Sequence, residues 1–338
     1  MPHIHMHKRH IRKALILVLI LACVSGVLFA VQIWESHQRQ QAMLRQEEID
    51  EPARRRREGW IEKDGQWYAP KSGLETMLVI GVDKTEPLED SGSYNNDSQA
   101  DFLLLTILDK TEETAAILHL NRDIMTQIPV LGVTGQHAGF ITGQLALAHT
   151  YGSGLQDSCK NTVDAVSMLL GGVDIDHYVG MTMGAVPLIN DMVGGVPVTV
   201  LDDFSGIDDA LVQGEEITLQ GEQAIHYVRI RAGLEDSSNL NRMKRQQQYL
   251  QSLVNQVQSL GEDFAPSPQQ MEELSRYLIS DCTVQELDSM AEKFSSYTLE
   301  EMQTVAGQAK KGTEYMEFYP DEAALEEQVL DLFYEAQE

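Results

Sequence analysis

Three apolar stretches between Thr76 and Asp123 constrain the fold most. They read TMLVIGVD, DFLLLTILD and TAAILHLNRD; each is short, rich in Val, Ile and Leu, and bounded by polar residues. Nearly continuous apolar runs of this length are typical of strands that are buried on both faces of a sheet. Such a sheet needs helices on both sides, so the three stretches favour an α/β domain.

Helical patterns alternate with strand patterns along the rest of the chain. Residues 161–172 end in a Gly-Gly pair, which is a stop signal, and residues 239–260 carry apolar side chains at helical spacing. Asp64-Gly65 lies between two alternating stretches and indicates a hairpin. We therefore predict a three-layer α/β/α domain with a central mixed sheet, preceded by a single N-terminal transmembrane helix.

The N-terminus has four basic residues followed by an apolar run over residues 14–34. About 20 apolar residues span a bilayer as a helix, and basic flanking residues favour a cytoplasmic N-terminus. We expect an uncleaved signal anchor in the cell membrane. The chain then consists of a cytoplasmic tail (1–13), the membrane helix (14–34), a stalk and hairpin linker (35–72) and an extracytoplasmic domain (73–338). That domain has a motif core (74–250), followed by C-terminal helices and a strand (262–338).

The chain has three cysteines. Cys23 falls in the apolar run, and Cys159 and Cys282 fall in the part expected outside the cell. Two cysteines so far apart in sequence do not form a zinc motif, and an oxidising compartment favours disulfides. We therefore predict a disulfide between Cys159 and Cys282.

The charge is uneven. The net charge is -27, but from Gly59 onward there are 15 Lys+Arg against 46 Asp+Glu. So acidic a domain would repel nucleic-acid phosphates, which excludes nucleic acid as a partner.

Four of the six arginines after Gly59 nevertheless lie within 17 residues, at Arg229, Arg231, Arg242 and Arg245. The planar arginine fork matches carboxylate or phosphate oxygens, so the cluster fits either structural ion pairs or an anion site. Arg242 and Arg245 fall in the first turn of a predicted helix, where positive charge opposes the helix dipole. An anion bound there would be held by the side chains and by the helix N-terminus.

Three aspartates, Asp83, Asp101 and Asp123, each end or begin an apolar strand. Carboxylates at strand ends either cap turns or supply the hard oxygen ligands that Mg²⁺ prefers. Strand ends are also where α/β folds build binding sites.

From about Leu74 to Leu250 the chain resembles the LytR–CpsA–Psr family of bacterial envelope phosphotransferases. Six segments carry the resemblance in the family's order: LVIGVD, ADFLLLTILD, NRDIMTQIP, DMVGGVPVTV, LQGEQAIHYVRIR and NRMKRQQ. The resemblance implies transfer of a glycopolymer, such as a teichoic acid, from a polyprenyl-pyrophosphate carrier to peptidoglycan at the membrane. It also implies Mg²⁺ or Mn²⁺ as cofactor and an apolar pocket for the lipid.

The resemblance assigns roles to individual residues. The catalytic set that it implies is Asp83, Asp101, Arg122 and Asp123, with Asp83 and Asp101 as metal ligands. The pyrophosphate-binding set is Arg122, Arg229, Arg231, Arg242 and Arg245, with Lys84 as a weaker candidate.

Four positions depart from the family's pattern. Asn121 stands where the family has a proline before Arg122, and Asn239 stands where it has an aspartate ahead of the last arginine motif. Where many members have Asp-x-Arg the chain has Asp83-Lys84-Thr85, and where they have Arg-Ser-Asp it has Gln99-Ala100-Asp101. Two phosphate-binding arginines are therefore absent. This keeps a second hypothesis open, in which the domain is a non-catalytic polyprenyl-phosphate-binding scaffold or regulator of the envelope.

Overall fold

The computed structural model describes residues 37–38, 40–41, 54–230, 239–261 and 266–337, with the backbone alone for Asn239 and Leu240. The chain forms two compact units: one holds the residues up to Pro70 with Ala336–Glu338, and the other holds Lys71–Glu335. The predicted cytoplasmic tail and membrane helix lie outside the described residues. None of the helices within the described ranges has the length and hydropathy that crossing a bilayer requires.

The smaller unit contains the hairpin that the sequence predicts. Strands β1 (Ile61–Lys63) and β2 (Gln66–Pro70) pair antiparallel. Asp64 and Gly65 between them have φ values of 51° and 80°. Both are positive, as the tight turn of a two-residue hairpin loop requires. The hairpin is therefore confirmed.

The larger unit is built on a seven-stranded sheet in the order β11-β8-β3-β4-β5-β12, with β13 also paired to β5. Strand β3 pairs in parallel with β8 and antiparallel with β4, so the sheet is mixed. The predicted α/β fold with a central mixed sheet is confirmed. The strands are β3 (Leu74–Val82), β4 (Ala100–Asp109), β5 (Thr114–Leu120), β8 (His177–Thr182), β11 (Leu278–Ser280), β12 (Thr298–Leu299) and β13 (Gln303–Thr304).

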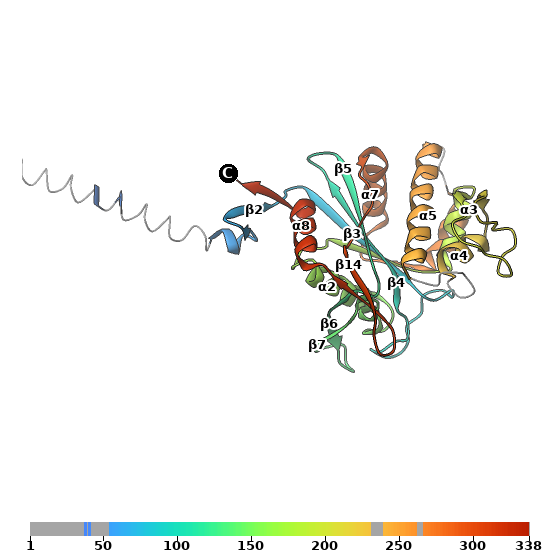
Figure 1. The fold of residues 1–338 in the computed structure, drawn as a ribbon, viewed down its shortest axis with the longest axis horizontal. Coiled ribbons are helices and arrows are strands. Elements are labelled where there is room, and N and C mark those ends of the chain that lie inside the picture. Colours follow the sequence, from blue (N-terminus) through green and yellow to red (C-terminus); the bar gives the residue numbers. More distant parts are fainter. Residues whose placement is uncertain (1–36, 39, 42–53, 231–238, 262–265, 338) are drawn as a thin grey trace, which may run out of the picture. The chain divides into compact units, whose positions relative to one another are not determined.

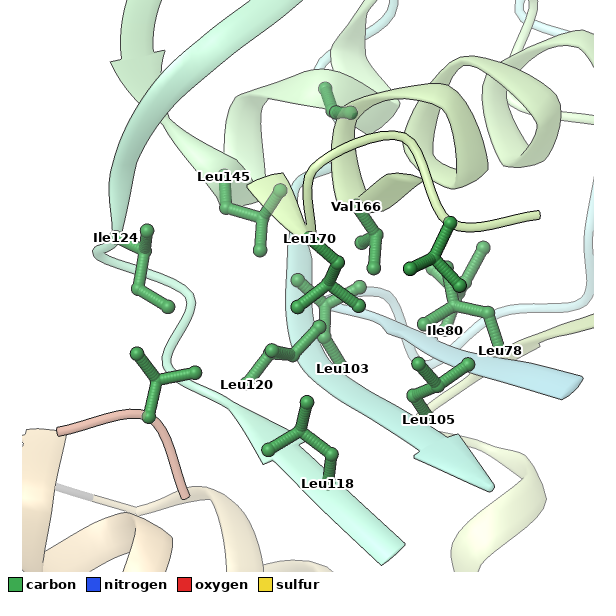
Figure 2. Packing of buried hydrophobic residues seen from close by; sticks show 14 of the residues in the cluster. Leu78, Ile80, Leu103, Leu105, Leu118, Leu120, Ile124, Leu145, Val166 and Leu170 are labelled. Atoms are coloured by element: carbon green, nitrogen blue, oxygen red, sulfur yellow. The ribbon is translucent and has the colours of Figure 1, made fainter. Parts of the chain in front are cut away.

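The main core lies on one face of this sheet. Alternate residues of the three long strands point to this face, because successive side chains of a strand point to opposite sides. Figure 2 shows them packed against Val166 and Leu170 of the helical layer. The strand residues are Leu78, Ile80, Leu103, Leu105, Leu118 and Leu120. The layer that covers them consists of η1 (Leu145–Thr150), α2 (Gln156–Leu169) and α8 (Glu322–Phe333).

Helices α5 (Asn239–Leu260) and α7 (Val284–Ser296) lie on the opposite face, which completes three layers (Figure 1). Helix α7 starts sharply because Thr283 and Glu286 form a reciprocal capping box at its N-terminus. Met290 of α7 is buried against the sheet.

A second core cluster lies beneath α5, around Phe204 and Tyr227. It is enclosed by α3 (Ala185–Met192), β9 (Val196–Thr199), β10 (Glu216–Leu219) and α4 (Glu222–Arg229). The sequence did not reveal several short or irregular elements. Among them are β6 (Met125–Leu131), β7 (His137–Gln144), α6 (Pro268–Ser275) and β14 (Gly307–Lys311), and the short strands β10, β11, β12, β13 and β16 (Tyr334–Gln337) were not predicted either. The remaining strand is β15 (Met316–Pro320).

The disulfide predicted between Cys159 and Cys282 is not formed, since both thiols are free. Cys159 is fully buried on α2 in the main core, and burial raises the pKa of its thiol to about 12. Cys282 lies just beyond edge strand β11 and is partly exposed. A disulfide needs closely apposed, aligned Cβ atoms, and neither compartment nor sequence spacing carries that information.

Candidate functional site

Asp101 is placed by a β-bulge. The register of β3 against β4 shifts after Gly81, so that Gly81 faces Phe102 while Val82 faces Ala100. Asp101 is therefore the extra residue on β4. A bulge breaks the regular alternation of a strand and re-aims the side chain of the extra residue. The Asp101 side chain is almost fully buried, with 4% of its surface exposed.

Two arginines from distant segments meet on this one carboxylate. Arg122 Nη1 donates to Asp101 Oδ1, and Arg242 Nη1 donates to Asp101 Oδ2 at 2.9 Å. Arg122 Nε also lies 3.4 Å from Asp123 Oδ1. Among the residues that the structure describes, two guanidinium groups thus face two carboxylates. An anion that took the place of the Asp101 oxygens would meet the same two Nη1 donors.

A tight turn presents Arg122 and Asp123. The N–H of Ile124 donates to the carbonyl of Asn121 at 3.1 Å, and the N–H of Asp123 donates to Asn121 Oδ1 at 3.0 Å. An asparagine side chain that bonds the backbone two residues on stabilises such a turn. Gln144 Nε2 then donates to Asp123 Oδ1 at 2.8 Å, which fixes the orientation of that carboxylate.

A second ion pair, between Arg229 and Asp83, lies at the solvent-exposed edge of the site, which we call the rim. Arg229, the last residue of α4, donates from Nε to Asp83 Oδ1 at 2.8 Å. Asp83 directly follows β3, and its N–H donates to the carbonyl of Gln99 at 3.1 Å. The two paired side chains are 40% and 38% exposed. Lys84 pairs with Asp97 at 3.2 Å, and that hydrogen bond lowers the pKa of Asp97. Both pairs are open to water and therefore weak.

Arg245 does not join the other arginines, which corrects the expectation from sequence. Its side chain is 1% exposed, its Nε donates to the carbonyl of Tyr227 at 2.7 Å, and its Nη2 donates to the carbonyl of Ile230. Its Nη1 pairs with Asp202. These carbonyls end α4, so Arg245 caps that helix. Residues three apart diverge by about 60° around a helix, which sends Arg242 and Arg245 in different directions. Arg231 lies outside the described residues.

Two polar residues beside the site were not singled out from sequence. Gln246 is buried one turn after Arg242 and donates to the carbonyl of Val228 at 3.1 Å. His119 of β5 is 2% exposed, and burial, with Arg242 nearby, lowers its pKa to about 4. Within the described residues, Gln246 Oε1 and His119 Nδ1 have no hydrogen-bond partner. Gln246 follows Arg242 by four residues, which is about one helical turn, so the sequence alone could have identified it as a neighbour of Arg242.

Two apolar cavities lie along helix α5, which also carries Arg242. One, of about 120 Å³, is lined by Phe102 next to Asp101 and by Gln246 next to the Arg242 turn. The other, of about 390 Å³, lies between the sheet and helices α5 and α7. Leu250 and Leu253 of α5 line both cavities. Helix α5 therefore carries Arg242 near its start and lines both apolar cavities further along.

Known proteins share this sequence pattern and fold. The polyisoprenyl-teichoic acid–peptidoglycan teichoic acid transferase TagU of Halalkalibacterium halodurans is 27% identical over 182 residues, which cover 54% of this chain and 52% of TagU. TagT of Bacillus subtilis, which has the same enzyme name, is 27% identical over 200 residues, 57% of this chain and 56% of TagT. The chain thus spans about half the length of the curated relatives it matches.

The structural comparison gives the same fold. A structure of TagT bound to LIIa-WTA superimposes with a TM-score of 0.59 at 22% identity, covering 77% of this chain and 90% of that chain. The family model LytR_cpsA_psr matches residues 34–331, which is most of the chain. The chain therefore belongs to the LytR_cpsA_psr family.

Proposed function

We propose that the protein is a membrane-anchored phosphotransferase that moves a glycopolymer from a polyprenyl-pyrophosphate carrier to peptidoglycan during cell-wall assembly. The observation that carries this proposal is the convergence of Arg122 and Arg242 on Asp101 beside an apolar cavity. The relatives TagU and TagT are named for the transfer of teichoic acid to peptidoglycan, which supports the same substrate class here.

The arginines would bind the pyrophosphate. Phosphate oxygens match the fork of Arg122 and Arg242 as the Asp101 oxygens do. A guanidinium about 4 Å from a phosphate oxygen contributes about 4 kcal/mol at an effective dielectric of about 20, before desolvation. Arg229 at the more exposed rim would contact the part of the carrier that faces the glycan. The prenyl chain would occupy the cavities lined by Leu250 and Leu253.

Asp83 and Asp101 suit Mg²⁺ or Mn²⁺ by donor chemistry. Mg²⁺ in proteins is usually held by one or two carboxylates together with substrate phosphates and water. These two aspartates lie at neighbouring strand ends, and Asp83 is partly exposed beside the rim. When bound, the ion supplies neutralising charge to the carboxylates and the phosphates. Neutralising Asp101 would also release Arg122 and Arg242 for the carrier.

The transfer itself needs positioning and charge stabilisation. The oxygen of the acceptor hydroxyl forms a bond to phosphorus, and the bond from that phosphorus to the bridging oxygen of the carrier breaks. The departing polyprenyl phosphate takes the electron pair, and Arg122 and Arg242 stabilise the negative charge that it gains. The hydroxyl proton leaves to water at the open rim.

The scaffold hypothesis is the second candidate. It is favoured by the ion pair between Lys84 and Asp97. Because Lys84 already binds Asp97, it does not clearly replace either of the two absent phosphate-binding arginines. The two hypotheses differ in turnover, because a scaffold binds the carrier and leaves it intact.

Asp101→Asn tests the transfer reaction. We expect the variant to bind a polyprenyl-pyrophosphate-linked glycan but to transfer it to peptidoglycan on the order of a hundredfold more slowly, with weaker Mg²⁺ dependence, because a charge that organises the site is lost. Asp97→Asn is the matched control, since Asp97 also pairs with a cation but is 89% exposed. Binding without turnover in the unmodified protein would establish the scaffold and overturn the transferase.

The proposed location has its own test. The basic residues ahead of the apolar run motivate a cytoplasmic N-terminus and an extracytoplasmic domain. A phosphatase reporter fused after Glu338, which folds only outside the cytoplasm, should be active. The matching cytoplasmic reporter, fused at the same position, should be silent. The reverse pattern would contradict the proposed topology.

A further inference from the structure

We propose that His177, Asp281 and Cys282 form a binding site for a thiophilic transition-metal ion such as Zn²⁺, separate from the arginine site. Their ligand atoms all lie within 4.8 Å of one another. Asp281 Oδ1 is 3.9 Å from His177 Nδ1 and 3.8 Å from Cys282 Sγ. In a tetrahedral zinc site such ligand atoms are about 3.3–3.6 Å apart, so closure requires a movement of roughly half an ångström for the two pairs with Asp281 and of up to about one ångström between His177 and Cys282.

Strand pairing brings the three residues together. Strand β11 runs antiparallel to β8, and Ser280 faces Val179. Two residues further along, this register sets Cys282 opposite His177. Cys282 and Asp281 are neighbours in sequence, so the three side chains gather where β11 ends and β8 begins. The residues come from segments that are 104 positions apart, which explains why no sequence motif reveals the site.

The backbone around the site is already ordered. The N–H of Tyr178 donates to Asp281 Oδ1 at 2.9 Å. Ser280 Oγ donates to the carbonyl of Tyr178 at 2.7 Å and accepts the N–H of Cys282 at 3.0 Å. Hydrogen bonds of this kind orient metal ligands before the ion binds. The segment that carries two of the ligands is therefore fixed against the strand that carries the third.

The donor set selects the class of ion. A thiolate, an imidazole and a carboxylate suit Zn²⁺ and similar ions, whereas Mg²⁺ takes oxygen ligands. One thiolate and one carboxylate balance a divalent charge, and the proton of the Cys282 thiol passes to water on binding. The side chains of His177 and Asp281 are 26% and 33% exposed, so a water molecule can complete the coordination.

A bound ion would fasten the start of α7 to the sheet. Cys282 directly precedes Thr283, the residue that caps α7. Leu287, Met290 and Phe294 of α7 line the cavity of about 390 Å³. Metal occupancy would therefore stiffen one wall of the apolar cavity without contact with the arginines.

Cobalt titration of the reduced full-length protein in detergent tests the site. We expect one equivalent of Co²⁺ to give a thiolate-to-cobalt charge-transfer band in the near ultraviolet, which Zn²⁺ then abolishes. Cys282→Ser should remove the band. His177→Gln and Asp281→Asn should each weaken Co²⁺ binding at least about tenfold. Because the band requires a thiolate, the histidines near the N-terminus cannot produce it.

The other two cysteines provide the controls. Cys23→Ser and Cys159→Ser should both keep the band, since Cys159 is fully buried in the core. Zn²⁺ should also raise the melting temperature of the unmodified protein and of these two controls, but not of His177→Gln. A protein without the band, or a band that persists in Cys282→Ser, would overturn the proposal.

Discussion

Arg242→Ala is expected to lower the affinity for a polyprenyl pyrophosphate on the order of a hundredfold or more. Arg242 is buried, with 3% of its side chain exposed, and it shares Asp101 with Arg122. Removing one partner from a buried, hydrogen-bonded set of charges typically costs about 2–5 kcal/mol of binding free energy. Isothermal titration with a short-chain polyprenyl pyrophosphate measures the loss directly.

The fold should survive this change, because Asp101 keeps Arg122 as a partner. Circular dichroism and the midpoint of urea unfolding check that point. Lys244→Ala is the matched control: Lys244 carries the same charge two residues away on α5, but it is exposed. The control should bind like the unmodified protein. Equal losses in the two variants would mean that helix charge in general, rather than the site, attracts the carrier.

Arg245→Ala is expected to have its effect on stability instead. The side chain contacts the carbonyls of Tyr227 and Ile230 and pairs with Asp202. Truncating it leaves the Asp202 carboxylate, which is 17% exposed, without its arginine, and leaves the end of α4 without its cap. Breaking a buried ion pair from one side costs about 3–5 kcal/mol of unfolding free energy. Urea unfolding at equilibrium measures this quantity.

The position of Arg229 gives the variant a second readout. Arg229 is the last residue of α4. If the end of α4 frays in Arg245→Ala, carrier binding should therefore weaken too, in proportion to the loss of unfolding free energy. Arg245→Lys should recover less than half of the stability, because lysine lacks the planar fork that reaches several acceptors at once. Full stability together with complete loss of carrier binding in Arg245→Ala would place Arg245 in the anion site, as the sequence predicted.

Local chemistry decided much of the architecture. The long strands followed from apolar runs, because a strand buried on both faces must be apolar throughout. The hairpin at Asp64-Gly65 followed from residues that tolerate positive φ. Asp83 and Asp101 were identifiable because polar residues that end apolar strands lie at the edge of a sheet, where sites form.

Only the tertiary structure decided how the charges are shared. Arg242 and Asp101 are 141 positions apart, and Arg245 is 43 positions from Asp202. The sequence analysis placed both arginines in the first turn of one predicted helix and therefore assigned them one role. The bulge that turns Asp101 toward Arg242 comes from the register between two strands, and the free Cys159 and Cys282 come from their places in two different layers. The sequence therefore determined which residues are available for ionic and metal chemistry, whereas their partners depend on long-range packing, which no local pattern encodes.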